Sequence, residues 1–164
     1  MEPSDEQFVV QLAEQHTAAL MLYARQWCEA PEDVVQEAFL ALIRQTQRPE
    51  NPVGWLYRVV RNAAITASRS AARRTRRESR LAHQSEPWFV AAPEDRLDAH
   101  VVTDALQSLP LEQRETIVAR LWGGLSLEEV ALLSNVSVAT AFRRYQAGLT
   151  VLRERLGITC LPKN

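Results

Sequence analysis

The chain has 164 residues, of which 46% are hydrophobic and 24% charged. This length suits one ordinary domain or two very small ones, and the composition excludes a disordered or fibrous protein. No window approaches 18 uncharged apolar residues, and the acidic start of the chain lacks the basic and apolar blocks of a signal peptide. We therefore expect a cytoplasmic protein without membrane insertion.

Nothing in the sequence points to catalysis. Cys28 and Cys160 show neither metal-ligand spacing nor the surroundings of a catalytic thiol, so we expect both to be reduced. There is no Walker loop, dinucleotide fingerprint or zinc spacing. The carboxylates of segment 33–37 have no His, Cys or Ser nucleophile at a helpful spacing. The sequence predicts a protein that is not an enzyme and needs no cofactor or metal.

The net charge of −1 hides a strong asymmetry along the chain. Residues 1–57 carry three arginines against nine acidic residues, whereas residues 58–80 carry eight arginines against one glutamate. Residues 81–164 are nearly balanced, with eight basic and ten acidic groups. One concentrated basic block predicts that an anionic partner is met at a single place. Almost all basic residues are arginine, which suits phosphate recognition, although genomic composition would produce the same bias.

Helical signals dominate the first part of the chain. A capping box at Ser4 and Gln7 precedes apolar residues at helical spacing, which predicts a first helix over residues 5–28. Pro31, followed by two acidic residues, opens a second helix that should end near Thr46.

A third helix should begin at Asn51 and Pro52, which repeat the pattern of a capping residue before proline. One face of this helix is cationic: Arg58, Arg61, Arg69 and Arg76 lie within an arc of about 80° on the helical wheel, with Asn62 and Ile65 on the same face. The side expected to face the core comprises Leu56, Val59 and Ala63. The cationic face could follow a phosphate backbone, with Trp55 and Tyr57 stacking on unpaired bases. Alternatively, the tryptophan belongs to the core, and the arginines near the end of the helix are simply solvated.

Between residues 78 and 95 the helical period fades, and Pro87 and Pro93 bracket a short apolar fragment. A structureless connection of this length is better placed between two domains than within one. The sequence thus predicts an all-α protein with two small helical domains, residues 1–77 and 96–164, joined by a linker over residues 78–95.

The second domain should contain four helices. Its first helix is marked by Leu97, Val101, Ala105 and Leu109, and the next covers residues 112–122. A capping box at Ser126 and Glu129 begins a short helix, the turn 134–137 follows, and the last helix covers residues 138–156. A short helix, tight turn and longer helix have the layout of a helix-turn-helix, whose second helix enters the DNA major groove.

Helical spacing separates the core side of the last helix from its outer side. Contacts between the two helices should come from Val130, Ala131, Val136 and Val138. Thr140, Arg143 and Ala147 would face DNA, with Arg143 suited to guanine edges and Arg144 to phosphates. The pattern alone also fits an ordinary helical hairpin with a solvated face, and it leaves open whether Phe142 is buried.

Four sequence blocks stand out by their order and spacing. They are Pro31-Glu-Asp-Val-Val-Gln-Glu-Ala-Phe39, Asn51-Pro-Val-Gly-Trp-Leu-Tyr-Arg-Val-Val-Arg-Asn62, Leu109-Pro-Leu-Glu-Gln-Arg-Glu115 and Gly124-Leu-Ser-Leu-Glu-Glu-Val-Ala131. Together they resemble the extracytoplasmic-function sigma factors of bacterial RNA polymerase, and the resemblance covers nearly the whole chain.

The resemblance implies a subunit that directs core RNA polymerase to promoter DNA and assists melting. The polymerase clamp helices would be contacted by Asp33, Gln36 and Glu37. The minus-ten element would be opened and held by the turn 47–51 and the third helix, through Asn51, Arg58, Arg61, Asn62 and Arg69. The minus-thirty-five element would be read by Ser137, Thr140, Arg143, Arg144 and Ala147. An anti-sigma factor is a further expected partner.

The chain departs from the family pattern in places. Thr66 stands where such sigma factors often carry aspartate, and Phe142 and Ala147 stand where basic residues are common, so promoter preference cannot be transferred directly. The alternative function is a stand-alone helix-turn-helix regulator, in which residues 1–77 would form a sensing or dimerising module. The negative net charge and the few recognition-helix arginines argue against strong DNA binding by the chain alone.

Overall fold

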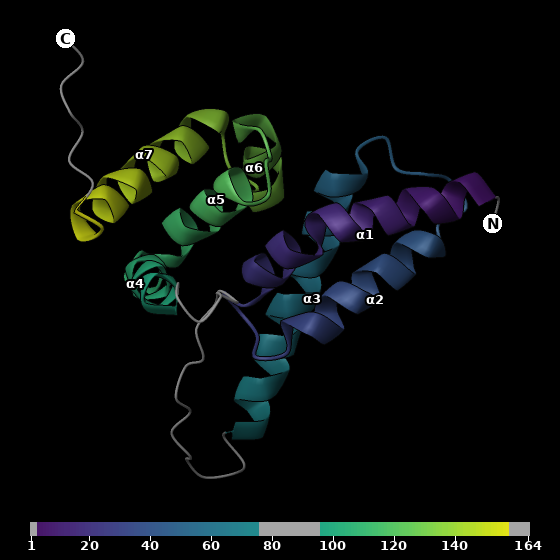
Figure 1. The fold of residues 1–164 in the computed structure, drawn as a ribbon, viewed down its shortest axis with the longest axis horizontal. Coiled ribbons are helices and arrows are strands. Elements are labelled where there is room, and N and C mark those ends of the chain that lie inside the picture. Colours follow the sequence, from purple (N-terminus) through teal and green to yellow (C-terminus); the bar gives the residue numbers. More distant parts are fainter. Residues whose placement is uncertain (1–2, 76–95, 158–164) are drawn as a thin grey trace. The chain divides into compact units, whose positions relative to one another are not determined.

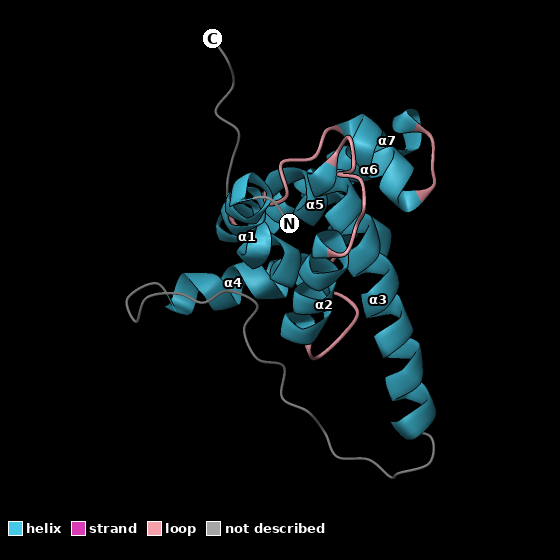
Figure 2. Cartoon of the chain, turned by 90° about the vertical axis from the view of Figure 1, so that its right-hand side faces the viewer, coloured by secondary structure: helices cyan, strands magenta, loops and turns pink. Residues whose placement is uncertain are grey.

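The structure, a computed structural model, describes residues 3–75 and 96–157. Within these ranges the chain forms seven α-helices and no strand (Figure 2). It divides into two compact units, Met1–His83 and Gln84–Asn164. The predicted all-α class with two small helical domains is confirmed. The linker expected over residues 78–95 lies outside the described residues, as do Arg76 and Cys160.

The first unit contains three helices, α1 (Pro3–Ala24), α2 (Pro31–Ile43) and α3 (Pro52–Thr75), and each contacts the other two. α1 and α2 run alongside one another (Figure 1). An aromatic cluster holds the unit together: the ring of Tyr23 meets Trp27 and Tyr57 edge-on, with centroid separations of 5.0 and 4.9 Å. Such pairs contribute about 0.5–1.5 kcal/mol each beyond the burial of their area.

Helix ends in this unit follow the local signals with small shifts. α1 begins at Pro3, so Ser4 lies inside the helix and the expected cap there is wrong; proline is favoured at a first helical position. α1 also ends at Ala24, before residue 28, because the chain tightens there into backbone hydrogen bonds of shorter spacing. α2 likewise ends before Thr46, at Ile43.

The buried side of α3 differs from the predicted one. Leu56 is buried as expected, but Tyr57 and Val60 are also fully buried, whereas Val59 and Ala63 are only half-buried. The helix is turned toward Tyr57 because that ring packs against the aromatic cluster. The prediction that Tyr57 stacks on unpaired bases is therefore wrong. Burial also raises the pKa of its hydroxyl above the ordinary value.

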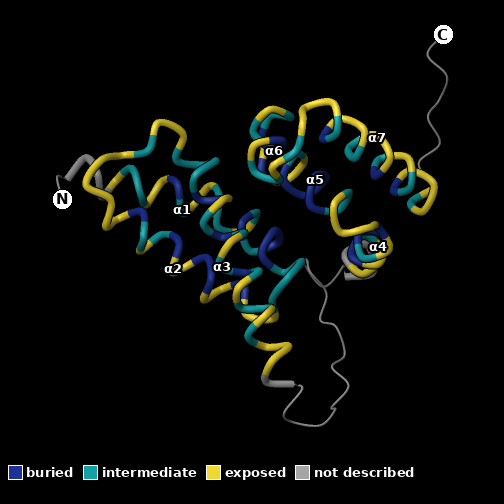
Figure 3. The backbone as a smooth tube through the Cα atoms, turned by 180° about the vertical axis from the view of Figure 1, so that it is seen from behind, coloured by how far each residue is buried: buried dark blue, intermediate teal, exposed yellow. Residues whose placement is uncertain are grey.

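The second unit contains α4 (Arg96–Gln107), α5 (Leu111–Leu121), α6 (Leu127–Ser134) and α7 (Val138–Arg155). α7 contacts each of the other three helices. α5 is the most buried, with every residue from 115 to 119 inside the core, and it appears dark blue over this stretch in Figure 3. In α4, Val101 is 47% exposed and not in the core as predicted, whereas Ala105, Leu106 and Leu109 are buried.

The helix-turn-helix is confirmed as a local structure. Ser126 and Glu129 form the predicted capping box, and Asn135 turns the chain with a φ of 54°, in the left-handed region that asparagine tolerates. Of the predicted packing residues, Val130 and Ala131 are buried. Val138 is 43% exposed, so its assignment to the helix contact is wrong.

At Gly148, α7 approaches α5 closely. A Cβ atom at this position would lie 2.8 Å from Cγ1 of Ile117, whose side chain is fully buried. Real Cβ atoms essentially never come this close to a neighbour, so the lack of a side chain at Gly148 permits the contact.

We predict that Gly148→Ala lowers the free energy of unfolding of the second unit by up to about 2 kcal/mol, because overpacking costs about 1–3 kcal/mol and the gain in helix propensity offsets only about 1 kcal/mol. Chemical denaturation followed by circular dichroism measures the change. The double substitution with Ile117→Ala should cost less than the sum of the single substitutions. Additive effects would show that the two positions are not in tight contact.

Candidate protein and nucleic-acid interfaces

The three residues predicted to bind polymerase lie on the outer side of α2. Asp33, Gln36 and Glu37 are exposed, while Val34 and Val35 on the opposite side are buried against the other helices. The acidic first turn also suits the positive end of the helix dipole. The other two helices of the first unit therefore leave the outer side of α2 exposed, and this side is available to a binding partner.

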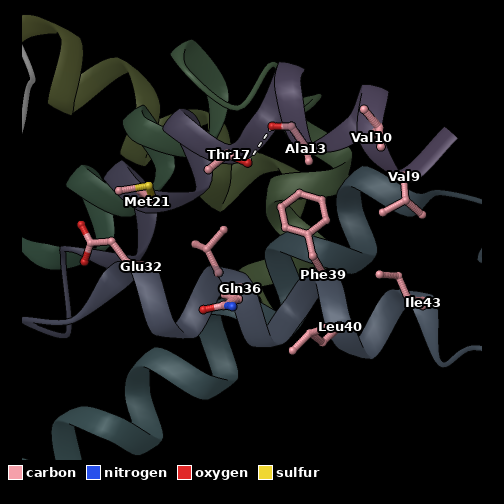
Figure 4. A pocket seen from close by; sticks show the side chains of 11 residues that line it. Val9, Val10, Ala13, Thr17, Met21, Glu32, Gln36, Phe39, Leu40 and Ile43 are labelled. Atoms are coloured by element: carbon pink, nitrogen blue, oxygen red, sulfur yellow. Dashed lines mark hydrogen bonds between the residues drawn. The ribbon is translucent and has the colours of Figure 1, made fainter. Parts of the chain in front are cut away.

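These three residues border two different grooves. Asp33 and Glu37 line a groove of about 540 Å³ between α2 and α3, and its other wall includes Asn62 and Thr66. Gln36 lines a second groove, of about 360 Å³, between α1 and α2 (Figure 4). The polar residues of α2 therefore form a ridge with a groove on each side. The groove between α2 and α3 also brings Asn62, predicted to bind DNA, next to two residues predicted to bind polymerase.

The groove between α1 and α2 is lined almost entirely by apolar side chains, and Figure 4 shows Phe39 on α2 facing α1. Val10, Leu40 and Ile43 at its edges are exposed. Leu40 and Ile43 were not among the residues predicted to bind a partner. The sequence does contain a signal for them. Residues 38–43 of α2 are apolar without interruption, and such a run covers more of the helix circumference than the one face that packs against the core.

The turn between α2 and α3 is held at both ends. The guanidinium carbon of Arg48 lies 3.9 Å from the ring centroid of Phe8, a cation–π contact between the turn and α1. At the start of α3, the carboxamide oxygen of Asn51 accepts a hydrogen bond of 2.9 Å from the Gly54 backbone N–H. The predicted capping role of Asn51 is confirmed, and a side chain at Gly54 would collide with it.

The described part of α3 carries five arginines and no acidic residue. Arg58 and Arg69 are exposed, Arg61 is half-buried, and Asn62 is exposed beside the groove between α2 and α3. Arg73 is exposed too, and its guanidinium donates to the Ser70 hydroxyl at 3.3 Å. The predicted cationic surface is present. Between its two exposed arginines, Arg58 and Arg69, Arg61 is less accessible.

At the start of α7 the structure links three predicted DNA-binding residues. The Ser137 hydroxyl oxygen caps the helix by accepting from the Thr140 backbone N–H at 3.1 Å. The Thr140 hydroxyl oxygen in turn accepts from Nη2 of Arg143 at 3.1 Å. Ala147 is exposed farther along, while Arg144 is half-buried. Phe142, whose burial the sequence left open, is 49% exposed.

Cys28 is a free thiol, and burial raises its pKa, which lowers the fraction of reactive thiolate at neutral pH. Among the described residues, no group of three or more His, Cys, Asp or Glu side chains could hold a metal ion. No helix in the described ranges is long and apolar enough to cross a bilayer.

The two units, with a basic helix in the first and a helix-turn-helix in the second, have the architecture expected of a helical DNA-binding protein. Comparison with known families makes this more specific. Residues 12–74 match the family model of Sigma-70 region 2, and residues 99–152 match that of Sigma-70, region 4.

The chain is 35% identical over 134 residues to the RNA polymerase sigma factor CarQ of Myxococcus xanthus, covering 77% of this chain and 74% of CarQ. It is 30% identical over 126 residues to an ECF RNA polymerase sigma-E factor of Haemophilus influenzae, covering 68% and 67%. The chain therefore belongs to the sigma-70 family of RNA polymerase sigma factors, in its extracytoplasmic-function group.

Solved structures share the fold. The sigma factor RpoE of Bartonella quintana, crystallised with the anti-sigma factor NepR, matches with a TM-score of 0.77 at 23% identity, over 94% of this chain and 99% of RpoE. CnrH, in complex with the cytosolic domain of CnrY, matches with a TM-score of 0.61 at 24% identity, over 94% and 91%. The family assignment favours a sigma factor over the stand-alone regulator.

Proposed function

We propose that this sigma factor binds core polymerase through the outer side of α2. On this proposal it opens promoter DNA with the turn before α3 and with α3 itself, and it reads an upstream duplex element with α7. It acts without catalysing a reaction, in the cytoplasm where the polymerase works. The observation that carries the proposal is the separation of chemistry in the first unit, where α2 exposes acidic and apolar groups and α3 exposes arginines.

The outer side of α2 has the anatomy of a protein interface. Its ridge carries Asp33, Gln36 and Glu37, and the apolar groove with exposed Leu40 and Ile43 lies beside it. Apolar contact area bordered by polar residues is typical of binding surfaces. Because the ridge has two carboxylates, its partner surface should be basic.

The α3 surface suits single-stranded DNA. Arg58, Arg61 and Arg69 lie along one helix that begins at the turn held by Asn51, so they can follow a backbone that leaves the duplex there. Asn62, at the edge of the groove shared with α2, would contact DNA beside the bound polymerase.

The α7 surface suits duplex DNA, because the first turns of a recognition helix meet base edges. Ser137, Thr140 and Arg143 form a connected polar group at that end. Arg144 would hold a phosphate at the side of the groove, and Ala147 would let the backbone approach closely.

An anti-sigma factor is part of this proposal. RpoE and CnrH are both known in complexes, with NepR and with the cytosolic domain of CnrY, and each matches 94% of this chain in fold. We expect a protein of this kind to compete with polymerase for the first unit.

Reconstitution tests the function as a whole. The purified chain is added to core polymerase and a library of genomic fragments, and specific transcripts are mapped. We expect defined start sites that appear only when both proteins are present. A chain that footprints its own operator without polymerase, and never supports initiation, would be a regulator and not a sigma factor.

For docking, we predict that Glu37→Lys or Asp33→Arg weakens binding to core polymerase by about tenfold or more, because an introduced like charge adds repulsion to a lost contact. Fluorescence titration of labelled chain with core polymerase measures this. Glu14→Lys makes the same charge change at an exposed position of α1 and should bind normally. Equal loss in Glu14→Lys would mean that net charge, not the α2 ridge, controls assembly.

For DNA, we predict that Arg58→Ala and Arg69→Ala impair opening at every promoter. Each substitution should reduce the slope of log binding constant against log salt concentration by about 0.7, the value for one single-strand phosphate contact. Arg143→Ala should instead relax preference at one base pair, by about 1–3 kcal/mol. Transcription from promoters with randomised upstream bases separates the two effects. Arg153→Ala, exposed near the end of α7, serves as the control. A change of base preference in Arg58→Ala would invert the assignment.

A further inference from the structure

α7 exposes an aromatic ring close to its polar DNA-facing group. Phe142 is 49% exposed, and Val138, one turn before it, is 43% exposed. The core side of the helix is occupied by Ala141, Gly148 and Leu152. A phenylalanine at this position therefore contributes only part of its surface to the fold.

The surroundings of Phe142 favour a polyanion as the partner. Two arginines follow Phe142 within two positions, and the helix carries no acidic residue before Glu154. Arg143 follows Phe142 directly, and its guanidinium donates to Thr140 on the first turn. For an apolar side chain at the edge of such a polar group to contribute to binding, the negatively charged partner must offer an apolar feature on its surface. In the major groove of DNA, that feature is the C5-methyl group of thymine.

We infer that Phe142 contacts a thymine methyl group in the upstream promoter element, next to the base pair that Arg143 reads. This inference rests on the proposed DNA-reading role of α7 and adds a specificity-determining residue to it. Phe142 is the fifth residue of the helix, within the turns that reach base edges in a helix-turn-helix. Its ring would exclude water from the methyl group and thereby favour an A·T pair over a G·C pair.

The exposed apolar residue on the neighbouring helix provides a matched control. Leu132 on α6 is 83% exposed, more than Phe142. The first helix of a helix-turn-helix crosses the DNA backbone and does not enter the groove. We therefore expect Leu132→Ala to leave base preference unchanged, although it also removes an exposed apolar side chain.

The experiment uses holoenzyme assembled from the full chain and core polymerase, with promoter fragments selected from a library randomised upstream. In the selected element, each thymine in turn is replaced by deoxyuridine, which removes the methyl group and keeps the base pairing. At one position, or at two adjacent ones, wild-type holoenzyme should bind about fourfold more weakly, the factor expected for one buried methyl group. Phe142→Ala should bind the thymine fragment with that same weakness and show no response to deoxyuridine. Phe142→Leu should keep part of the response, and Leu132→Ala all of it.

Three results would overturn the inference. The first is a selected element with no A·T pair next to the base pair whose preference Arg143→Ala relaxes, and the second is an equal response of wild type and Phe142→Ala to every deoxyuridine. The third is a defect of Phe142→Ala in polymerase binding alone. Circular dichroism confirms that the variants fold. Failure of the proposed function looks different, because Arg143→Ala would then also have no effect on upstream preference.

Discussion

The close contact of α7 with α5 at Gly148 and Ile117 determines which side of α7 faces outward. Each residue along a helix turns its side chain by 100°, so fixing one buried position fixes all the exposed ones. With Ala141 and Gly148 inside, Arg143 and Phe142 must lie outside. The reading surface of the second unit is therefore a consequence of a packing contact on the opposite side of the same helix.

The first unit follows the same rule with larger side chains. Tyr23 and Tyr57 pack edge-on, and this contact sets the rotation of α3. Arg58, the next residue, is then directed to solvent. α2 buries Val34 and Val35 and exposes the ridge of Asp33, Gln36 and Glu37 on either side of them. Small helical units have few buried positions, so each one has a large influence on the surface that is left for binding.

Most helix positions could be predicted from the sequence because their signals are local. Pro31, Asn51 and Ser126 mark helix starts through proline geometry or side-chain caps, which need no knowledge of the rest of the fold. The buried side of α3 could not be predicted to the residue, because Val60 replaces Val59 in the core only when Tyr57 meets Tyr23.

The candidate surfaces divide in the same way. The exposure of Asp33 and Glu37 follows from their charge, but the two grooves beside them depend on where α1 and α3 lie, which no local signal specifies. The exposure of Phe142 depends on α5 for the same reason. Family blocks in the sequence supplied the order of the two units and the expected roles of their surfaces.

The hydrogen bond from Arg143 to Thr140 bears on the entropy of recognition. A free arginine side chain samples many rotamers, and holding it in one geometry costs up to about 2 kcal/mol. Here Ser137 caps the helix, Thr140 contacts Ser137 through its hydroxyl, and Arg143 is held by Thr140. Part of the ordering of Arg143 is thus completed when the unit folds, so that less conformational freedom is lost on binding.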